Sequence, residues 1–281
     1  QHHQNHHNHH HHHYYHHHHH NNHQGDAAHT FFLKDITHPN LKTELNAYST
    51  SKNTLSLYHT NIRSLNKNFD LLKEHLKIQN QPADVIALTD NYLQHDTSSY
   101  GIPGHTPKHK KGISVYTKNN LYSTVEEKID IPETSTIILH IHQNKQKNNP
   151  THTIINTYRR PRKAPNFIED LQKAIDEIRT KYPNTTITIQ GDLNIDLRKL
   201  TAQVYNFLVE NNLYTTITTP TRYCPVNKTT ATTIDVILTT RSETAVTAGT
   251  ISPPISDHLP IYAIFHEPNN RDQQIRDKTL S

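Results

Sequence analysis

One stretch decides the fold of this chain: Thr186-Ile187-Thr188-Ile189-Gln190-Gly191-Asp192-Leu193-Asn194-Ile195-Asp196. Alternating Thr and Ile predict a β-strand, and the side chains of Asp192 and Asn194 should leave one face of it where the strand ends. Gly191 has no Cβ, so a ligand or another strand can approach its backbone closely. An isolated Gly-Asp-x-Asn is more often an ordinary turn capped by its own side chains. The rest of the chain must therefore decide between a turn and a site.

Composition divides the 281 residues into four parts. Residues 1–24 are almost entirely His, Asn, Gln and Tyr and hold more than half of the 27 histidines, which predicts a low-complexity tail with no core. Residues 25–53 form a polar lead-in without a clear period, and residues 267–281 form a polar C-terminal tail. Residues 54–266 are expected to fold as one domain, because they show no repeat and no internal boundary.

Charge and cysteine content restrict the class of protein. The net charge of +4 and the isoelectric point of about 8.9 are compatible with a polyanionic partner but do not require one. A single cysteine, Cys224, excludes an internal disulfide framework. No apolar run approaches the roughly 20 residues that span a bilayer, so no membrane partner is expected. The chain contains no Met, which is typical of a piece of a longer reading frame.

Hydrophobic periodicity predicts many strands and few helices. Strands are expected at 54–60, 83–89, 113–116, 121–131, 136–141, 153–158, 232–239 and 259–265 besides the opening one, helices near 69–78, 166–182 and 200–211, and loops at 100–112 and 218–223. The close succession of the pieces at 113–116, 121–131 and 136–141 predicts antiparallel pairing among them. We therefore expect an α/β fold of two packed, mainly antiparallel sheets with helices outside.

Polar residues recur where the expected strands end. They are Asn61, Asp90, Tyr158, Asp192 with Asn194, and Asp257 with His258. Asp235 differs, because it lies among apolar residues of a strand, and an unpartnered buried charge costs several kcal/mol. His258 is the expected partner of Asp235, since a carboxylate fixes the tautomer of a histidine and raises its pKa for general acid–base catalysis. Asp257 and His258 must then lie on a bend, which Pro260 helps to set.

Five motifs occur in a fixed order at these positions. They are Asn61-Ile62-Arg63-Ser64-Leu65, Tyr158-Arg159-Arg160-Pro161, Gly191-Asp192-Leu193-Asn194, Thr233-Ile234-Asp235 and Ser256-Asp257-His258-Leu259-Pro260. In this order and at these intervals they resemble the motifs of the endonuclease/exonuclease/phosphatase superfamily, over residues 54–266. The first motif and the Pro220-Thr221-Arg222 loop most resemble the apurinic-type endonuclease domain of non-LTR (LINE-type) retrotransposons.

The resemblance implies a four-layer α/β sandwich that uses Mg²⁺, or Mn²⁺ in its place, to nick double-stranded target DNA for retrotransposition. It implies no small-molecule cofactor beyond the metal, and a nuclear site of action follows from the substrate. Carried over residue by residue, it places metal-side groups at Asn61, Asp90 and Asp257. It places the catalytic groups at Asp192 for the attacking water, His258 with its orienting Asp235, and the phosphate-contacting Tyr158 and Asn194. Arg159 and Arg160, beside Tyr158, are expected to contact the DNA backbone, because basic side chains supply most sequence-independent affinity.

One position departs from the family pattern and leaves alternatives open. The family has Glu where this chain has Asp90, and the loss of a methylene draws the carboxylate back by about an ångström, which can cost on the order of 10²-fold in rate. Asn91 or an inserted water are the expected means of compensation. The alternatives to an active nuclease are a weakened or inert copy that keeps the fold and DNA binding, and a phosphatase or lipid phosphodiesterase of the same fold.

Overall fold

Two six-stranded sheets form the body of the protein. The computed structural model describes residues 54–78, 82–95, 97–146, 149–223, 230–242 and 245–266; both tails, the lead-in and Cys224 lie outside these ranges. The first sheet has the order β13 (Val246–Thr250), β14 (Ile261–His266), β1 (Thr54–Asn61), β2 (Val85–Thr89), β4 (Ile113–Lys118) and β3 (His105–Lys110). The second has the order β5 (Ser123–Glu126), β6 (Ser135–Ile141), β7 (His152–Tyr158), β8 (Thr186–Asp192), β12 (Asp235–Thr239) and β9 (Tyr214–Thr215). Each sheet has one parallel pair, β1–β2 and β7–β8, and is otherwise antiparallel.

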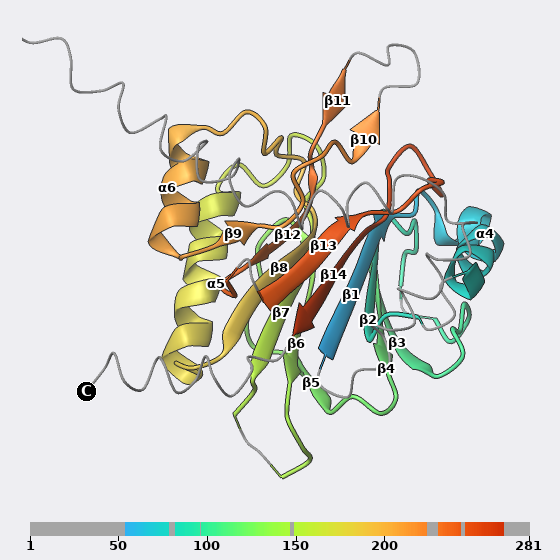
Figure 1. Ribbon diagram of the computed structural model, residues 1–281, viewed down its shortest axis with the longest axis horizontal. Coiled ribbons are helices and arrows are strands. Elements are labelled where there is room, and N and C mark those ends of the chain that lie inside the picture. Colours follow the sequence, from blue (N-terminus) through green and yellow to red (C-terminus); the bar gives the residue numbers. More distant parts are fainter. Residues whose placement is uncertain are drawn as a thin grey trace, which may run out of the picture.

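Helices cover the outer faces of both sheets (Figure 1). Helix α4 (Leu65–Ile78) packs on the first sheet, and α5 (Phe167–Lys181) and α6 (Ala202–Glu210) pack on the second. The apolar stripe of α5 is buried as its helical spacing predicts. A third apolar core, which includes Leu57, Ile237 and Phe265, lies between the sheets. The expected four-layer α/β sandwich is therefore confirmed, and no described helix is long and apolar enough to cross a membrane.

The alternation of side chains along β8 explains what each residue of the stretch 186–192 contacts. Ile187 and Ile189 pack under α5, while Gln190 points between the sheets and donates a hydrogen bond to the carbonyl of Tyr58 in β1 at 2.9 Å. Asp192 has the same parity as Gln190 and ends β8 at the edge where β1, β2 and β7 also end. Gly191 has φ +151°, and a Cβ there would collide with the carbonyl oxygen of Thr157 in β7. The close approach expected at Gly191 is thus to a neighbouring strand.

Several expected elements need correction. The expected loop at 100–112 contains β3, an edge strand whose Pro107 and polar side chains gave no apolar alternation. Within the expected strand at 121–131 only β5 forms. The strands β5 and β6 pair in the second sheet, whereas β4 lies in the first sheet and does not pair with them. The expected strand 232–239 is divided between β11 (Ala231–Thr232) and β12, so Asp235 begins a strand instead of lying in its middle. The expected loop at 218–223 ends in β10 (Arg222–Tyr223), which pairs with β11 in a hairpin that projects from the sandwich (Figure 1).

Candidate active site

Asp235 is held by two histidines, one in β1 of the first sheet and one in the loop before β14. Its Oδ2 lies 2.8 Å from Nδ1 of His258, and its Oδ1 lies 3.1 Å from Nε2 of His59 in β1. All three side chains are buried. Burial by itself would raise the pKa of Asp235, but the charge and hydrogen bonds of His258, with those of His59, hold it well below its usual value. Asp235 is therefore an ionised carboxylate at the pH of the cell.

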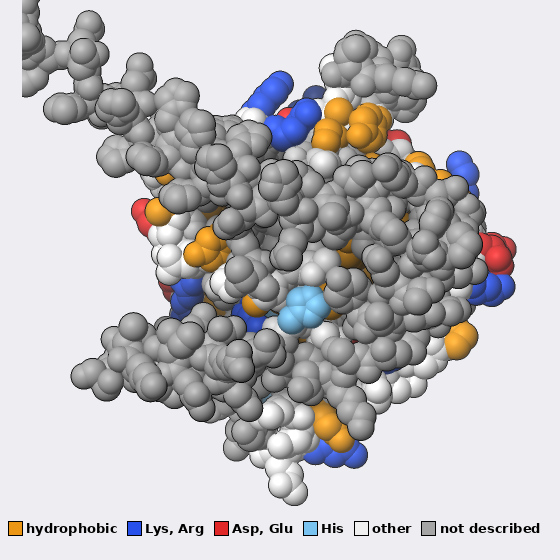
Figure 2. Space-filling view, in the orientation of Figure 1, with side chains coloured by type: hydrophobic (Ala, Val, Ile, Leu, Met, Phe, Trp, Pro, Cys, Tyr) orange, Lys and Arg blue, Asp and Glu red, His pale blue; other side chains and the backbone are white. Residues whose placement is uncertain are grey.

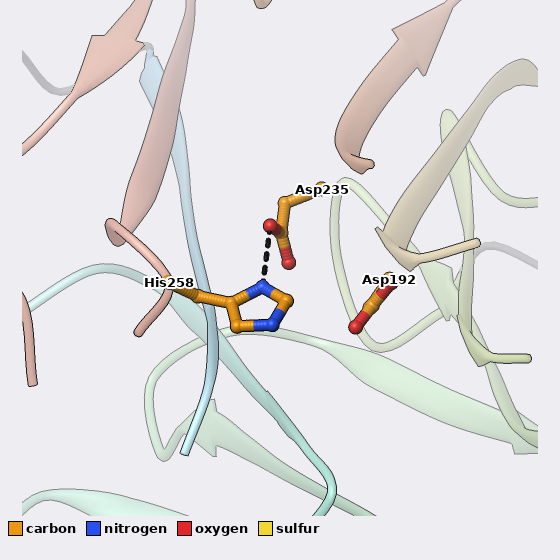
Figure 3. Close-up of side chains that lie close together, drawn as sticks. All are labelled: Asp192, Asp235 and His258. Carbon is orange, nitrogen blue, oxygen red and sulfur yellow. Dashed lines mark hydrogen bonds and ion pairs between the residues drawn. The ribbon is translucent and has the colours of Figure 1, made fainter. Parts of the chain in front are cut away.

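His258, the expected partner of Asp235, lies beside it. Burial opposes its protonation, but Asp235 raises the pKa of His258 above its usual value. Because Nδ1 is turned to Asp235, the other ring nitrogen is left on the side of Asp192 (Figure 3). One carboxylate oxygen of Asp192, one of Asp235 and one ring nitrogen of His258 all lie within 4.8 Å of one another, close enough to hold a metal ion together. The imidazole thus lies between two acids and has a fixed orientation.

Asp192 faces Asp235 across the strand pair β8–β12, where the two residues are in register. The carboxylate of Asp192 accepts hydrogen bonds from Nδ2 of Asn61 at 3.0 Å and from the backbone N–H of Asn194 at 3.1 Å. Burial and the nearby charge of Asp235 raise the pKa of Asp192 to about 6. A carboxyl group with this pKa is a suitable base at neutral pH.

Asn194 departs from the strand geometry expected for it. The strand β8 ends at Asp192, and Asn194 has a left-handed backbone with φ +50°. Its Nδ2 donates to the carbonyl of Arg159 at 2.6 Å, and one N–H of the amide remains for another acceptor. Asn194 therefore joins the β8 end to the loop after β7 and supports the carboxylate of Asp192.

Asp90 and Tyr158 meet at the ends of β2 and β7. Burial first, then the charges of Asp90 and Asp192 and a hydrogen bond with Asp90, raise the pKa of the Tyr158 hydroxyl. The hydroxyl therefore keeps its proton and can donate it in a hydrogen bond. The neighbouring Asn91 does not compensate for the shorter Asp90, because its amide binds Lys110 O and Ser114 Oγ and accepts from the N–H groups of Gly112 and Leu93.

The two arginines expected to contact DNA have different surroundings. Nε of Arg159 donates to the carbonyl of Lys163 at 2.9 Å, and its guanidinium lies over the ring of Phe167. Arg159 thus stabilises its own loop. Arg160 lies over the ring of Tyr158, with 5.4 Å between its Cζ and the ring centroid, and so remains beside the candidate site.

Three residues at the site were missed by sequence reasoning. They are His59, Arg63 and Arg222. Arg63 Nη2 donates to Oδ2 of Asp257 at 3.0 Å, and Arg222 Nε donates to the same oxygen at 3.1 Å. His59 could have been found from the sequence, because in an alternating strand it lies on the same face as Asn61. Both arginines stand in quoted motifs, but nothing in the sequence pairs them with Asp257.

The donor set on the metal side fits a hard divalent cation. Asn61 and Asp90 offer amide and carboxylate oxygens, which Mg²⁺ prefers, and this ion keeps several waters. Burial first, and then the charge of Asp235, raise the pKa of Asp192, and a cation nearby would stabilise its ionised form. Asp257, the other expected metal-side acid, is paired with the two arginines. The residues that fit the ion are therefore Asn61 and Asp90, with Asp192 beside them.

Comparison with known proteins gives a family match over part of the chain and a fold. A family described as "Endonuclease-reverse transcriptase" matches residues 152–262, whereas no curated protein sequence matches the chain. Among solved structures, the endonuclease domain of TRAS1, a telomere-specific non-LTR retrotransposon, has a TM-score of 0.56 at 13% identity and covers 76% of this chain and 98% of its own. An endonuclease/exonuclease/phosphatase family protein from Bacteroides thetaiotaomicron has a TM-score of 0.56 at 12% identity, with coverage of 76% and 98%.

A third similar structure is that of D. rerio TDP2 complexed with single-strand DNA product, with a TM-score of 0.52 at 17% identity and coverage of 76% of this chain and 99% of its own. At these identities the structures show a shared fold. The family match lies over the segment that carries Tyr158, Asp192, Asp235 and His258. The chain therefore has the fold of these endonuclease/exonuclease/phosphatase structures, and its residues 152–262 match the endonuclease-reverse transcriptase family.

Proposed function

We propose that this chain is a metal-dependent DNA endonuclease of the retrotransposon type. The observation that carries the proposal is the pairing of an ionised Asp235 with His258 opposite Asp192, an acid whose pKa is raised to about 6. Pairs of carboxyl groups whose environments separate their pKa values are typical of hydrolytic sites. The family match and the TRAS1 endonuclease domain support DNA as the substrate.

Asp192 is the group that prepares the attacking water. It is held by Asn61 and Asn194, and in its ionised form it accepts a proton from a water placed in line with the scissile P–O bond. That water attacks phosphorus as the bond to the 3′ oxygen breaks. A divalent ion bound by Asn61 and Asp90 would supply charge stabilisation to the phosphoryl and leaving oxygens.

His258, Tyr158 and Asn194 serve the phosphoryl oxygens. The Nε2 of His258, the protonated hydroxyl of Tyr158 and the remaining N–H of the Asn194 amide are donors at the same edge. Donors that are already oriented stabilise the charge that develops on the non-bridging oxygens at little cost in reorganisation. Asp235 does not touch substrate; it is a positioning residue for His258.

The test is nicking of supercoiled plasmid by the purified chain with Mg²⁺, with Mn²⁺ and with EDTA. Wild-type protein should nick only with a divalent ion, and Asp192→Asn and His258→Ala should each lower the rate by about 10²–10⁴-fold. Lys173→Gln, on the outer helix α5, is the control and should nick normally. Nicking that persists in EDTA or in both variants would show that the assigned site is wrong. Hydrolysis of phosphoinositides or sphingomyelin without nicking would identify a lipid phosphodiesterase instead.

A weakened copy is the second candidate, and Asp90 favours it. In addition to its short side chain, Asp90 has φ +55°, and its Oδ2 lies 3.9 Å from Nε of Arg63. A cationic group already lies close to the acid that should hold the ion. A wild-type nicking rate near background, rescued by Asp90→Glu, is the result that this candidate requires.

A further inference from the structure

Two arginines from distant segments meet on one carboxylate beside the candidate active site. Arg63, in the loop after β1, places Nη2 at 3.0 Å from Oδ2 of Asp257 and Nε at 2.9 Å from Oδ1, the latter without hydrogen-bond geometry. Arg222, the first residue of β10, places Nε at 3.1 Å from Oδ2. His258 follows Asp257 in the chain, and its Nε2 lies 3.9 Å from Oδ1 of Asp257.

The backbone of Arg63 is strained in a way that sets its direction. Arg63 and Ser64 have φ +48° and +83°, left-handed values that side-chain-bearing residues seldom adopt. The conformation is held because the N–H of Arg63 donates to Oδ1 of Asn61 and the N–H of Ser64 donates to the carbonyl of Asp90. Strained backbone of this kind, held by its surroundings, clusters at functional sites and ligand clamps.

Arg222 is fixed from the other side. It forms an isolated β-bridge with His258, and the N–H of Leu259 donates to the carbonyl of Thr221 at 2.7 Å. Among the described residues, the side chain of Arg222 forms a hydrogen bond and an ion pair with Asp257, both through Nε. A guanidinium has five N–H groups in a rigid fork, so the two terminal nitrogens of Arg222 carry further donors.

The two guanidinium groups belong to a small network of charges. Both are paired with Asp257, and Nε of Arg63 also lies 3.9 Å from Oδ2 of Asp90, so Arg222 has only the shared carboxylate as its ion-pair partner among the described residues. The side chains of Arg63 and Arg222 are 38% and 40% exposed. In the space-filling view, hydrophobic side chains (orange) lie at the base of the β10–β11 hairpin, and basic ones (blue) lie to the left of it along the upper edge (Figure 2). Two partly exposed guanidinium groups on one carboxylate are suited to an anion, because guanidinium forks match the geometry of phosphate.

We infer that Arg63 and Arg222, held together by Asp257, form a clamp for a backbone phosphate of DNA next to the phosphate that is cut. The inference deepens the proposed function and rests on it for the choice of DNA. Asp257 is then a positioning residue that keeps the two guanidiniums side by side. The clamp would set where the duplex lies relative to His258 and Asp192.

The test measures binding without cleavage. A short fluorescein-labelled duplex is titrated with the full chain in EDTA, and fluorescence anisotropy gives the dissociation constant at a series of salt concentrations. Arg63→Gln and Arg222→Gln should each weaken binding by about tenfold and reduce the slope of log K against log salt by about 0.9, as expected for one lost phosphate contact. Lys173→Gln removes the same charge far from the site and should leave both quantities nearly unchanged.

Two further variants separate a clamp from a general charge effect. Arg63→Lys keeps the charge but loses the fork, so it should recover only part of the affinity. Asp257→Asn removes a negative charge, so simple electrostatics predicts tighter binding, whereas a clamp that has lost its support predicts weaker binding. Since EDTA is present, a role of Asp257 as a metal ligand predicts no loss. Circular dichroism of each variant confirms that it is folded.

The outcomes distinguish the clamp from the proposed function. Arg63 and Arg222 variants that bind DNA with the wild-type slope overturn the clamp, even if the wild-type chain nicks plasmid. A slope reduced in both arginine variants supports the clamp, even if the wild-type chain proves unable to nick. Tighter binding by Asp257→Asn also overturns it, because the arginines then act only as independent charges.

Discussion

Asp235 and Asp192 stand opposite each other in β12 and β8, the first hydrogen-bonded to two histidines and the second to two amide groups. Like charges directly opposite in an antiparallel pair repel each other. The two histidines bind Asp235 and stabilise its ionised form, so Asp235 is the acid that carries the charge. The pKa of Asp235 falls below its usual value, and that of Asp192 rises to about 6. Adjacent acids thus acquire different chemical roles.

The raised pKa of Asp192 predicts a pH-dependent cost in stability. Because the pKa rises from 3.8 to about 6 on folding, folding favours the protonated acid, and stability is lost as the pH rises through about 6. Asp192→Asn, which cannot ionise, should therefore be more stable than wild type by about 3 kcal/mol at pH 8 and gain little at pH 4. Urea denaturation in EDTA at both pH values measures the difference. An equal effect at both pH values would contradict the assigned pKa.

The pairing of Asp235 with His258 predicts a loss in turnover on Asp235→Asn. The amide can present its N–H to Nδ1, which then favours the wrong tautomer and removes the charge that stabilises the protonated ring. The nicking rate at saturating DNA should fall by about 10²–10⁴-fold, with little change in KM because Asp235 is buried away from the substrate. Steady-state nicking of a defined duplex separates kcat from KM. A change confined to KM would argue against a positioning role.

The parts predicted from sequence were those that depend on short-range pattern. The alternation of Ile187 and Ile189 with polar residues predicts β8. A charged Asp235 among apolar neighbours must have a partner, and His258 was the expected one. The edge strand β3 was missed, because Pro107 and its polar neighbours carry no burial signal. The contacts of Arg63 and Arg222 with Asp257 were missed for another reason: they join three distant segments that come together only when the sheets pack.

The shortened acid at position 90 predicts a gain of function. Asp90→Glu restores the methylene that the family pattern has, and it should bring the carboxylate toward the ion expected at Asn61. The concentration of Mg²⁺ required for half-maximal nicking should fall, and the rate should rise by up to about 10²-fold. Asp84→Glu is the matched control, since Asp84 binds Ser56 away from this edge. If neither the metal requirement nor the rate changes in Asp90→Glu, the short side chain does not limit the site.

The contacts of His59 predict that its replacement lowers the stability of the protein and also affects the candidate active site. Its Nε2 lies 3.1 Å from Asp235 Oδ1 and its Nδ1 lies 3.2 Å from the carbonyl of Ala87. The ring therefore connects β2 of the first sheet to a fully buried carboxylate of the second sheet.

Replacement of His59 by Phe should therefore cost about 3 kcal/mol in the free energy of unfolding at pH 7, because a buried charge loses one of its partners. His75→Phe is the matched control. His75 is also buried, but its pKa is lowered to about 4 by burial, and its ring contacts the hydroxyl of Tyr58, so the loss should be about 1 kcal/mol. Equal losses in the two variants, measured by urea denaturation, would show that His59 acts only as packing. A larger loss in His59→Phe together with a lower nicking rate would mean that the support of Asp235 by the first sheet is part of the site.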